Sequence, residues 1–184
     1  MKDHLFRYIL RLAGTLLLIT GITAALLAGV NAVTAPRIAA AKEEKTLEAV
    51  SAVLPDAESA KPAEHFEDAT GTVRAVYVSD TGYAVQCEPA GFNGKISMMV
   101  GIDREGRVLG ISIISHSESP NLGAVAADKT EKGQQFRQQF AGKTGPLAVT
   151  KDGGSIDALT SATITSRAVA AGVNAALECV GRFG

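Results

Sequence analysis

A run of hydroxyl side chains near the C-terminus is the densest concentration of potential chemistry in the chain. Its members are Thr160, Ser161, Thr163 and Thr165. An apolar repeat with spacings of four, four and three residues follows, formed by Val169, Val173, Leu177 and Val180. This spacing predicts an amphipathic helix. The hydroxyls then lie at its first turn or just before it, where unpaired N–H groups and the helix dipole favour a phosphate.

Two interpretations of these hydroxyls remain open from the residues alone. Ser and Thr are common helix caps and form local turns at most helix starts, with no ligand involved. An anion site is the alternative, although the segment lacks the Gly-rich run and the Lys of a P-loop. The spacing does not say which hydroxyl is special.

The four residues Thr160-Ser161-Ala162-Thr163, preceded by Asp157, resemble a known motif. It is the flavinylation motif, usually Ser/Thr-Gly-Ala-Thr, of the FMN-binding domain family found in Rnf G subunits and in the C subunit of sodium-pumping NADH:quinone reductase. The resemblance implies that Thr163 carries FMN through a phosphoester bond and that Thr160, Ser161 and Ala162 cradle the phosphate. Ser161 stands where the family usually has Gly, so the backbone either avoids a positive φ there or accepts mild strain.

A second segment, Glu118 to Gly123, resembles the Glu-Thr-Pro-Gly-Leu-Gly stretch of the same family. The resemblance implies that Glu118, Leu122 and Gly123 lie beside the flavin ring. Asn121 replaces a Gly, and Asn is the next best residue for a left-handed conformation. From the residues alone, Glu118 could equally be a solvated carboxylate or a cap, and Leu122 an ordinary loop anchor.

The N-terminal part has the composition of a membrane anchor. A basic lead, residues 1–11, precedes 12–36, which is free of charge and longer than the roughly 20 residues that cross a bilayer. A cleaved signal peptide is the alternative, but its apolar region is shorter. Basic residues are balanced on the two sides of the span, so they do not orient it. The resemblance implies a single pass through the inner, cytoplasmic membrane, with the C-terminal domain on the extracytoplasmic side.

The rest of the chain predicts an α+β domain. Residues 37–70 are expected to form a helix (42–54) and an irregular connection (55–69), and residues 71–184 the FMN-binding domain. Strands of an antiparallel or mixed sheet are predicted at 72–79, 83–88, 95–102 and 107–115. Leu109, Ile111 and Ile113 alternate along the last strand and are expected to face the core. Phe136 and Phe140, on a helix predicted at 131–141, are expected in the core with other flanking helices.

Several classes of function are disfavoured. The net charge is −1 and acidic and basic residues are well mixed along the sequence, so no basic cluster suggests nucleic-acid binding. His116 and Glu118 have no neighbouring Cys or His ligands in the sequence, which argues against a metal site. Cys87 and Cys179 lack a CxxC spacing, and whether they pair is left open. Among the aromatic residues, Tyr83 and Phe92 are the candidates to flank a ring.

The resemblance as a whole implies a membrane-anchored subunit of an ion-translocating, Rnf-type ferredoxin:NAD oxidoreductase complex. It would relay electrons through covalent FMN and would not be a stand-alone enzyme, so no catalytic residues are assigned. The implied partners are the other membrane and redox subunits and a flavin transferase that acts on FAD. The alternative is a structural or assembly subunit that has the same fold but carries no flavin.

Overall fold

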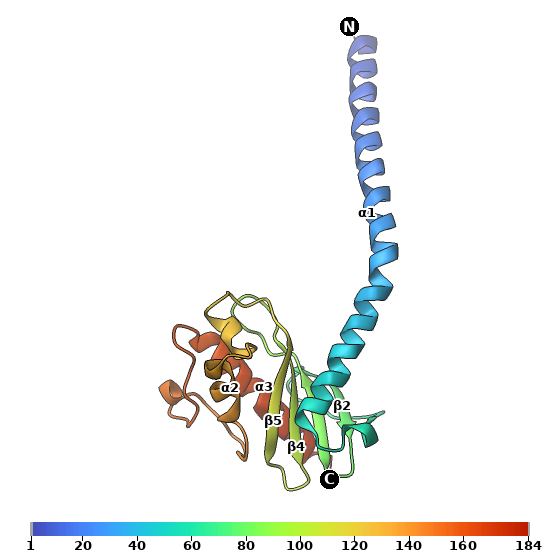
Figure 1. Cartoon of the computed structure of the whole chain (residues 1–184). Helices are drawn as coiled ribbons and strands as arrows, with labels where there is room; N and C mark the ends of the chain where they lie inside the picture. The colour runs from blue at the N-terminus through green and yellow to red at the C-terminus, as the bar shows by residue number, and fades with distance from the viewer. Residues whose placement is uncertain (1, 184) are drawn as a thin grey trace. The chain divides into compact units, whose positions relative to one another are not determined.

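The computed structural model describes residues 2–183 and divides into two compact units, Met1–Glu44 and Lys45–Gly184. Figure 1 shows the order of the elements. The helices are α1 (Lys2–Val53), α2 (Glu131–Gln138) and α3 (Thr163–Gly181), with short 3-10 turns η1 (Ala57–Ser59), η2 (Gly123–Ala126) and η3 (Thr150–Asp152). The strands are β1 (Lys61–Pro62), β2 (Val73–Val78), β3 (Gly82–Cys87), β4 (Ser97–Asp103) and β5 (Val108–Ser115). The α+β class expected from the sequence is confirmed.

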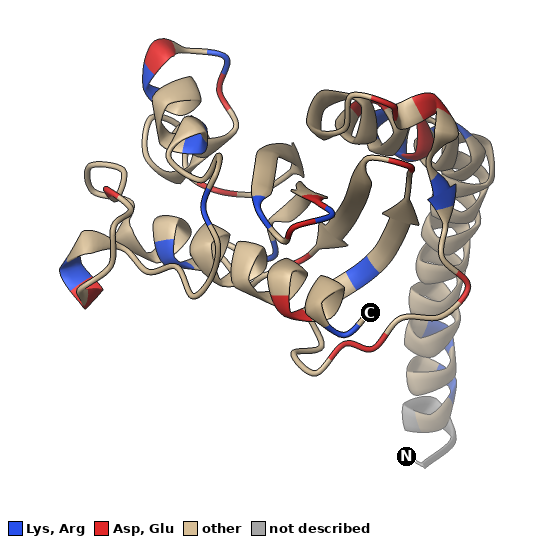
Figure 2. Cartoon of the chain, turned by 90° about the horizontal axis from the view of Figure 1, so that it is seen from below, with Lys and Arg blue, Asp and Glu red and all other residues tan. Residues whose placement is uncertain are grey.

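Helix α1 is longer than expected, because the predicted span and the predicted helix at 42–54 join into one helix that includes Pro36. Within the described residues it is the one helix long and apolar enough to cross a membrane, and its most apolar part is not buried against the rest of the chain. Its ribbon in Figure 2 is free of charged colours over the middle of its length. Threonine hydroxyls in this stretch donate to carbonyls one turn back, as Thr20 does to Leu16 (2.9 Å), which satisfies them without water.

The sheet has five antiparallel strands in the order β1-β2-β3-β4-β5. The four predicted strands are confirmed, and their ends shift by at most two residues. The expectation of an irregular connection over 55–69 is wrong at β1, where Lys61 pairs with Val78 and Pro62 with Tyr77. A proline is tolerated there because β1 is an edge strand and needs few ladder donors.

The predicted inward face of β5 needs one correction. Gly101 pairs with Gly110 but Ile102 pairs with Val108, so Leu109 is an extra residue that bulges out of the ladder. Its side chain is 39% exposed, whereas Ile111 is buried and Ile113 is partly buried against the core. The bulge shifts the alternation, so Val108 takes the inward position that Leu109 was expected to hold.

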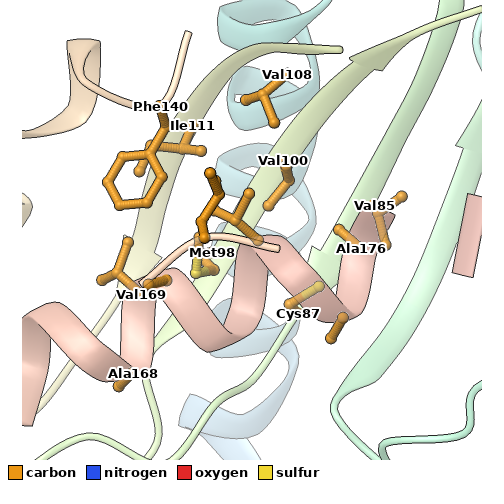
Figure 3. Packing of buried hydrophobic residues seen from close by; sticks show 14 of the residues in the cluster. Val85, Cys87, Met98, Val100, Val108, Ile111, Phe140, Ala168, Val169 and Ala176 are labelled. Carbon is orange, nitrogen blue, oxygen red and sulfur yellow. The ribbon is translucent and has the colours of Figure 1, made fainter. Parts of the chain in front are cut away.

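Both faces of the sheet are covered. Helices α2 and α3 pack on one face, where the side chains of β3 and β4 meet those of α3 in a buried apolar cluster (Figure 3). Phe136 and Phe140 are buried there edge to face, with ring centroids 5.6 Å apart, which confirms their assignment to the core. The last turns of α1 cover the other face, through a cluster of Ala49, Val50, Val53, Leu54, Ala84 and Met99. Residues 45–54 therefore belong to the folded domain, ahead of the start at residue 71 expected from the sequence.

The two cysteines lie within this core as free thiols, Cys87 on β3 and Cys179 on α3. Burial raises the pKa of Cys87 to about 12, and burial also raises the pKa of Cys179. Each thiol therefore stays protonated and behaves as a small apolar side chain.

Tight turns close one end of the sheet, and side-chain hydrogen bonds hold these turns together. The Asp56 carboxylate, just after α1, accepts from the backbone N–H of Thr81 (3.1 Å) and from its hydroxyl. The Thr81 hydroxyl bond holds the pKa of Asp56 well below its usual value. Arg104 lies over the ring of Tyr83, 4.7 Å from its centroid, and donates to the Tyr83 hydroxyl (2.7 Å).

Candidate functional site

The opposite end of the sheet carries a pocket of ≈ 310 Å³. Three segments build it, namely the loop between β3 and β4, the loop after β5, and the start of α3. Its walls are Phe92, Glu118, Ser119, Leu122, Gly123, Ser161, Ala162, Thr163, Ile164 and Thr165. Six of the seven site residues expected from the sequence are therefore brought together, and Thr160 is the exception.

The start of α3 has the character of an anion site. Ala162 occupies the N-cap position and the helix receives no side-chain cap. The preceding turn is held by Ser166, whose hydroxyl donates to the Ala162 carbonyl (3.0 Å) and accepts from the Leu159 N–H (3.0 Å). The hydroxyl run therefore does not cap this helix. Its first N–H groups remain available to an anionic ligand at the positive end of the dipole.

Two residues that replace family glycines take the left-handed conformation. Ser161 has φ 61° and Asn121 has φ 60°. For Ser161 the structure answers the question left open by the sequence, because the chain accepts the strain instead of avoiding a positive φ. Such strain costs about 1–2 kcal/mol for a residue with a Cβ.

The Thr163 side chain is half-buried in the pocket wall and meets a cation. Its Oγ1 accepts a hydrogen bond from Lys151 Nζ (3.2 Å). Lys151 belongs to η3, and its neighbour Asp152 forms a two-bond ion pair with Arg167 of α3 (2.6 and 2.7 Å). The hydrogen bond from Arg167 lowers the pKa of Asp152, so this pair stays charged. Sequence reasoning missed Lys151, and a single lysine in a polar loop carries no pattern that would reveal it.

Glu118 is a buried carboxylate that joins the three segments of the pocket. One oxygen accepts from the N–H groups of Phe92 (2.9 Å) and Asn93 (3.0 Å), and the other accepts from the Thr165 hydroxyl. Its side chain is 7% exposed, so the solvated alternative is excluded. Glu118 lines the pocket, and its bonds also fix the pocket's shape, which the sequence did not indicate. Charge-assisted bonds of this kind are about twice as strong as neutral ones.

Gly123 is required by close packing against this carboxylate. A Cβ at this position would collide with Glu118 Oε2 and with the Thr165 hydroxyl oxygen. Gly91 is constrained similarly, since a Cβ there would press on Glu118 Oε1. The glycines therefore allow the two loops to close on Glu118.

The mouth of the pocket gathers exposed apolar side chains. After α1, the described residues contain four large apolar side chains that are exposed: Phe92 (64%), Leu109 (39%), Leu122 (42%) and Ile164 (48%). Three of them, all except Leu109, line this pocket. A concentration of this kind marks a binding surface, and its chemistry suits a flat aromatic ring.

Thr160, expected to help cradle the phosphate, and Tyr83, a candidate to flank the ring, do not line this pocket. Thr160 is exposed and lines a neighbouring pocket of ≈ 330 Å³ together with Asp157. Tyr83 is at the far end of the sheet beside Arg104, whereas Phe92, the other candidate, lines the pocket. His116 accepts from the Glu118 backbone N–H through Nδ1 (3.2 Å). Within residues 2–183 no group of three His, Cys, Asp or Glu side chains could hold a metal ion.

Comparison with family models agrees with this geometry. Residues 91–178 match the FMN-binding domain, a range that contains every wall of the pocket. Residues 1–53 match the RnfG N-terminal region, which coincides with α1.

Related proteins identify the family more closely. The chain is 36% identical over 173 residues to the G subunit of the ion-translocating oxidoreductase complex of Stutzerimonas stutzeri, covering 85% of this chain and 74% of that protein. It is 31% identical over 196 residues to the G subunit of the Na(+)-translocating ferredoxin:NAD(+) oxidoreductase complex of Acetobacterium woodii, covering 94% and 92%. Identity to the proton-translocating counterpart of Clostridium ljungdahlii is 41% over 104 residues, about half of each protein (55% and 54%). The chain therefore belongs to the family of G subunits of ion-translocating oxidoreductase complexes.

Proposed function

We propose that this chain is the electron-transfer subunit of an Rnf-type ferredoxin:NAD oxidoreductase complex and carries FMN through a phosphoester bond to Thr163. The observation that carries the proposal is the position of the Thr163 hydroxyl. It stands in the wall of an open pocket, at an uncapped helix start and beside a lysine.

The residues present fit both halves of FMN. A phosphate esterified to Thr163 would meet the free N–H groups of the first turn of α3 and the Lys151 ammonium. The isoalloxazine ring is flat and largely apolar, and Phe92, Leu122 and Ile164 offer an apolar surface of matching chemistry. Ser161 and Ala162 would line the phosphate end of the site.

Bound FMN supplies the reversible electron transfer. The contribution of the chain is to hold and shield it. Glu118 ties the Phe92 loop to α3, so the pocket walls keep their spacing whatever the state of the cofactor. The apolar rim excludes water from the part of the ring that it covers. An ester bond removes the dissociation equilibrium, which matters for a carrier outside the cytoplasm.

Attachment of the flavin requires a second protein. A flavin transferase acting on FAD would form the bond between Thr163 Oγ1 and the phosphorus of the FMN half. The bond between the two phosphates of FAD breaks in the same step, AMP leaves, and the hydroxyl proton is released. Other membrane and redox subunits of the complex are the proposed partners of the loaded protein.

The apolar helix α1 supports a membrane span, and the proposed orientation rests on the family resemblance. The helix would cross the inner membrane once, with the N-terminus in the cytoplasm and the folded domain on the extracytoplasmic side. A reporter enzyme that is active on only one side of the membrane, fused after residue 183, tests the orientation. Activity of a cytoplasm-specific reporter would reject it.

Mass spectrometry of the full-length protein from membranes that contain the whole complex tests the covalent attachment. The peptide containing Thr163 is expected to carry one FMN less one water. The Thr163→Ala variant should lose the flavin fluorescence that otherwise survives denaturation in a gel. An unmodified Thr163 peptide in those membranes would leave the alternative, a structural subunit without flavin.

A further inference from the structure

Five hydroxyls cluster at the start of α3, and they differ in what surrounds them. Thr165 is buried and donates to Glu118, and Ser166 is buried and bonds to Ala162 and Leu159. Neither can reach a ligand without breaking the pocket wall. Thr160 is exposed on the neighbouring pocket. Two hydroxyls, those of Ser161 and Thr163, therefore remain as acceptors in the main pocket.

A lysine distinguishes these two hydroxyls. Lys151 Nζ donates to Thr163 Oγ1 (3.2 Å), while Ser161 is exposed and has no hydrogen-bond partner within the described residues. The ammonium occupies one lone pair of the Thr163 oxygen and holds the side chain in one orientation. The second lone pair is left to form a bond.

The position of Lys151 is fixed by the loop that carries it. On one side of Lys151, Thr150 N–H donates to the Ile156 carbonyl (2.8 Å), and Ile156 itself is fully buried. On the other side, Asp152 is held by Arg167, which lies one helical turn after Thr163. The lysine is thus directed at Thr163 by contacts that do not involve Thr163.

The two cations next to Thr163 differ in how closely a carboxylate approaches them. Arg167 is matched by Asp152, but Lys151 has no carboxylate at salt-bridge distance within the part of the chain that the structure describes. A phosphodiester carries one negative charge. A phosphodiester on Thr163 would therefore place a negative charge directly beside the Lys151 ammonium.

We propose that Lys151 is the positioning residue that directs flavin attachment to Thr163 in preference to Ser161. This inference rests on the proposed function. The ammonium orients the Thr163 oxygen, attracts the phosphate of the incoming flavin dinucleotide, and neutralises the diester that remains. The bonds made and broken are those given above: the bond between Thr163 Oγ1 and phosphorus forms, AMP leaves, and the proton of the hydroxyl is released to solvent.

The rate of flavin attachment tests the role of Lys151. Full-length protein and its variants are incubated with FAD, Mg²⁺ and a limiting amount of flavin transferase, and covalent flavin is followed by intact mass. Lys151→Gln, which keeps a donor but removes the charge, is expected to slow attachment about tenfold, the scale of one charge-assisted hydrogen bond. Lys151→Arg is expected to remain within about threefold of wild type, because it keeps the charge. Peptide mapping of Lys151→Gln should also show a larger share of flavin on Ser161.

Lys143 provides the matched control. It is a half-buried lysine that also donates to a hydroxyl, that of Ser155 (3.1 Å), away from the pocket. Lys143→Gln should load at the wild-type rate. Thermal melting of the unloaded variants separates a charge effect from unfolding, since the exposed Lys151 should be replaced without loss of stability.

The outcomes separate this inference from the proposed function. If wild type accepts no flavin, the proposed function fails. If wild type is loaded and Lys151→Gln loads equally fast at Thr163, the function stands and the role of Lys151 is rejected. Equal slowing of Lys151→Gln and Lys151→Arg, with melting unchanged, would also reject the charge as the cause.

Discussion

The two ends of the sheet are stabilised in different ways. At the end near Asp56, short turns are tied by the half-buried Asp56 and the exposed Arg104, which bond to Thr81 and to Tyr83 and Ser79. At the pocket end, longer loops converge on Glu118, which is buried and fully bonded. The comparison teaches that long loops around a ligand need an internal tie, whereas tight turns are held by their own backbone and need only surface support.

The largest effect is expected for Glu118→Ala. It leaves the N–H groups of Phe92 and Asn93 and the Thr165 hydroxyl without their acceptor, and should lower the free energy of unfolding by about 3 kcal/mol. Urea denaturation of the full-length protein in detergent measures it. Glu105→Ala, an exposed carboxylate in the opposite turn, is the control and should change stability by less than about 0.5 kcal/mol. Equal losses in the two variants would remove the distinction between the ends.

Gly123→Ala should have the next largest effect. The added Cβ meets Glu118 Oε2 and the Thr165 hydroxyl oxygen, and overpacking at such a position costs about 2 kcal/mol. We also expect less flavin to be attached, because the loop bearing Leu122 must move. Gly110→Ala on β5 has nothing within 4 Å of its Cβ and serves as the control. A Gly123→Ala protein with wild-type melting and loading would show that this loop can move freely.

The variant Asp56→Asn, at the end of the sheet opposite the pocket, should have a smaller effect on stability that depends on pH. The folded-state pKa of Asp56 is lowered by the Thr81 hydroxyl, so the carboxylate stabilises the fold above its ordinary pKa near 4. This stabilisation is lost as the pH falls below that value toward the folded-state pKa. The variant should thus be less stable than wild type at pH 7, and the difference should shrink by pH 3. Denaturation at pH 7, 5 and 3 measures it, and a difference that does not vary with pH would contradict the role of the charge.

The smallest effect is expected for alkylation of the two buried thiols, Cys87 and Cys179. Because burial raises the pKa of Cys87 to about 12, neither cysteine should react with iodoacetamide at pH 8 in the folded protein. Both should react once urea unfolds the domain. Mass spectrometry of the alkylated protein checks this, and rapid labelling of Cys87 in native buffer would mean that the core opens often.

Much of the architecture could be predicted because it follows from local patterns. Alternating apolar residues located the four long strands, and helical spacing located α3. The bulge at Leu109 could not be predicted, because an extra residue in one strand is defined only by its pairing with the next. The short strand β1 was missed because Pro62 and two flanking polar segments carry no strand pattern.

The site was predictable to the extent that it is continuous in sequence. The segments around Glu118 and Thr163 each resemble a family motif, and the fold brings them together in one pocket. The tertiary contacts within the site could not be predicted. The bond between Lys151 and Thr163 joins two loops, and the bonds to Glu118 come from residues 25 to 47 positions away.

The final turns of α1 have a practical consequence for anyone who wishes to express the domain without its membrane helix. A fragment beginning at residue 71 would strip Val50 and Val53 from the sheet and leave Ala84 and Met99 open to water. A fragment beginning at Lys45 retains this layer and removes the exposed apolar stretch. The shorter fragment should aggregate, and the longer one should remain monodisperse in solution, which size-exclusion chromatography measures.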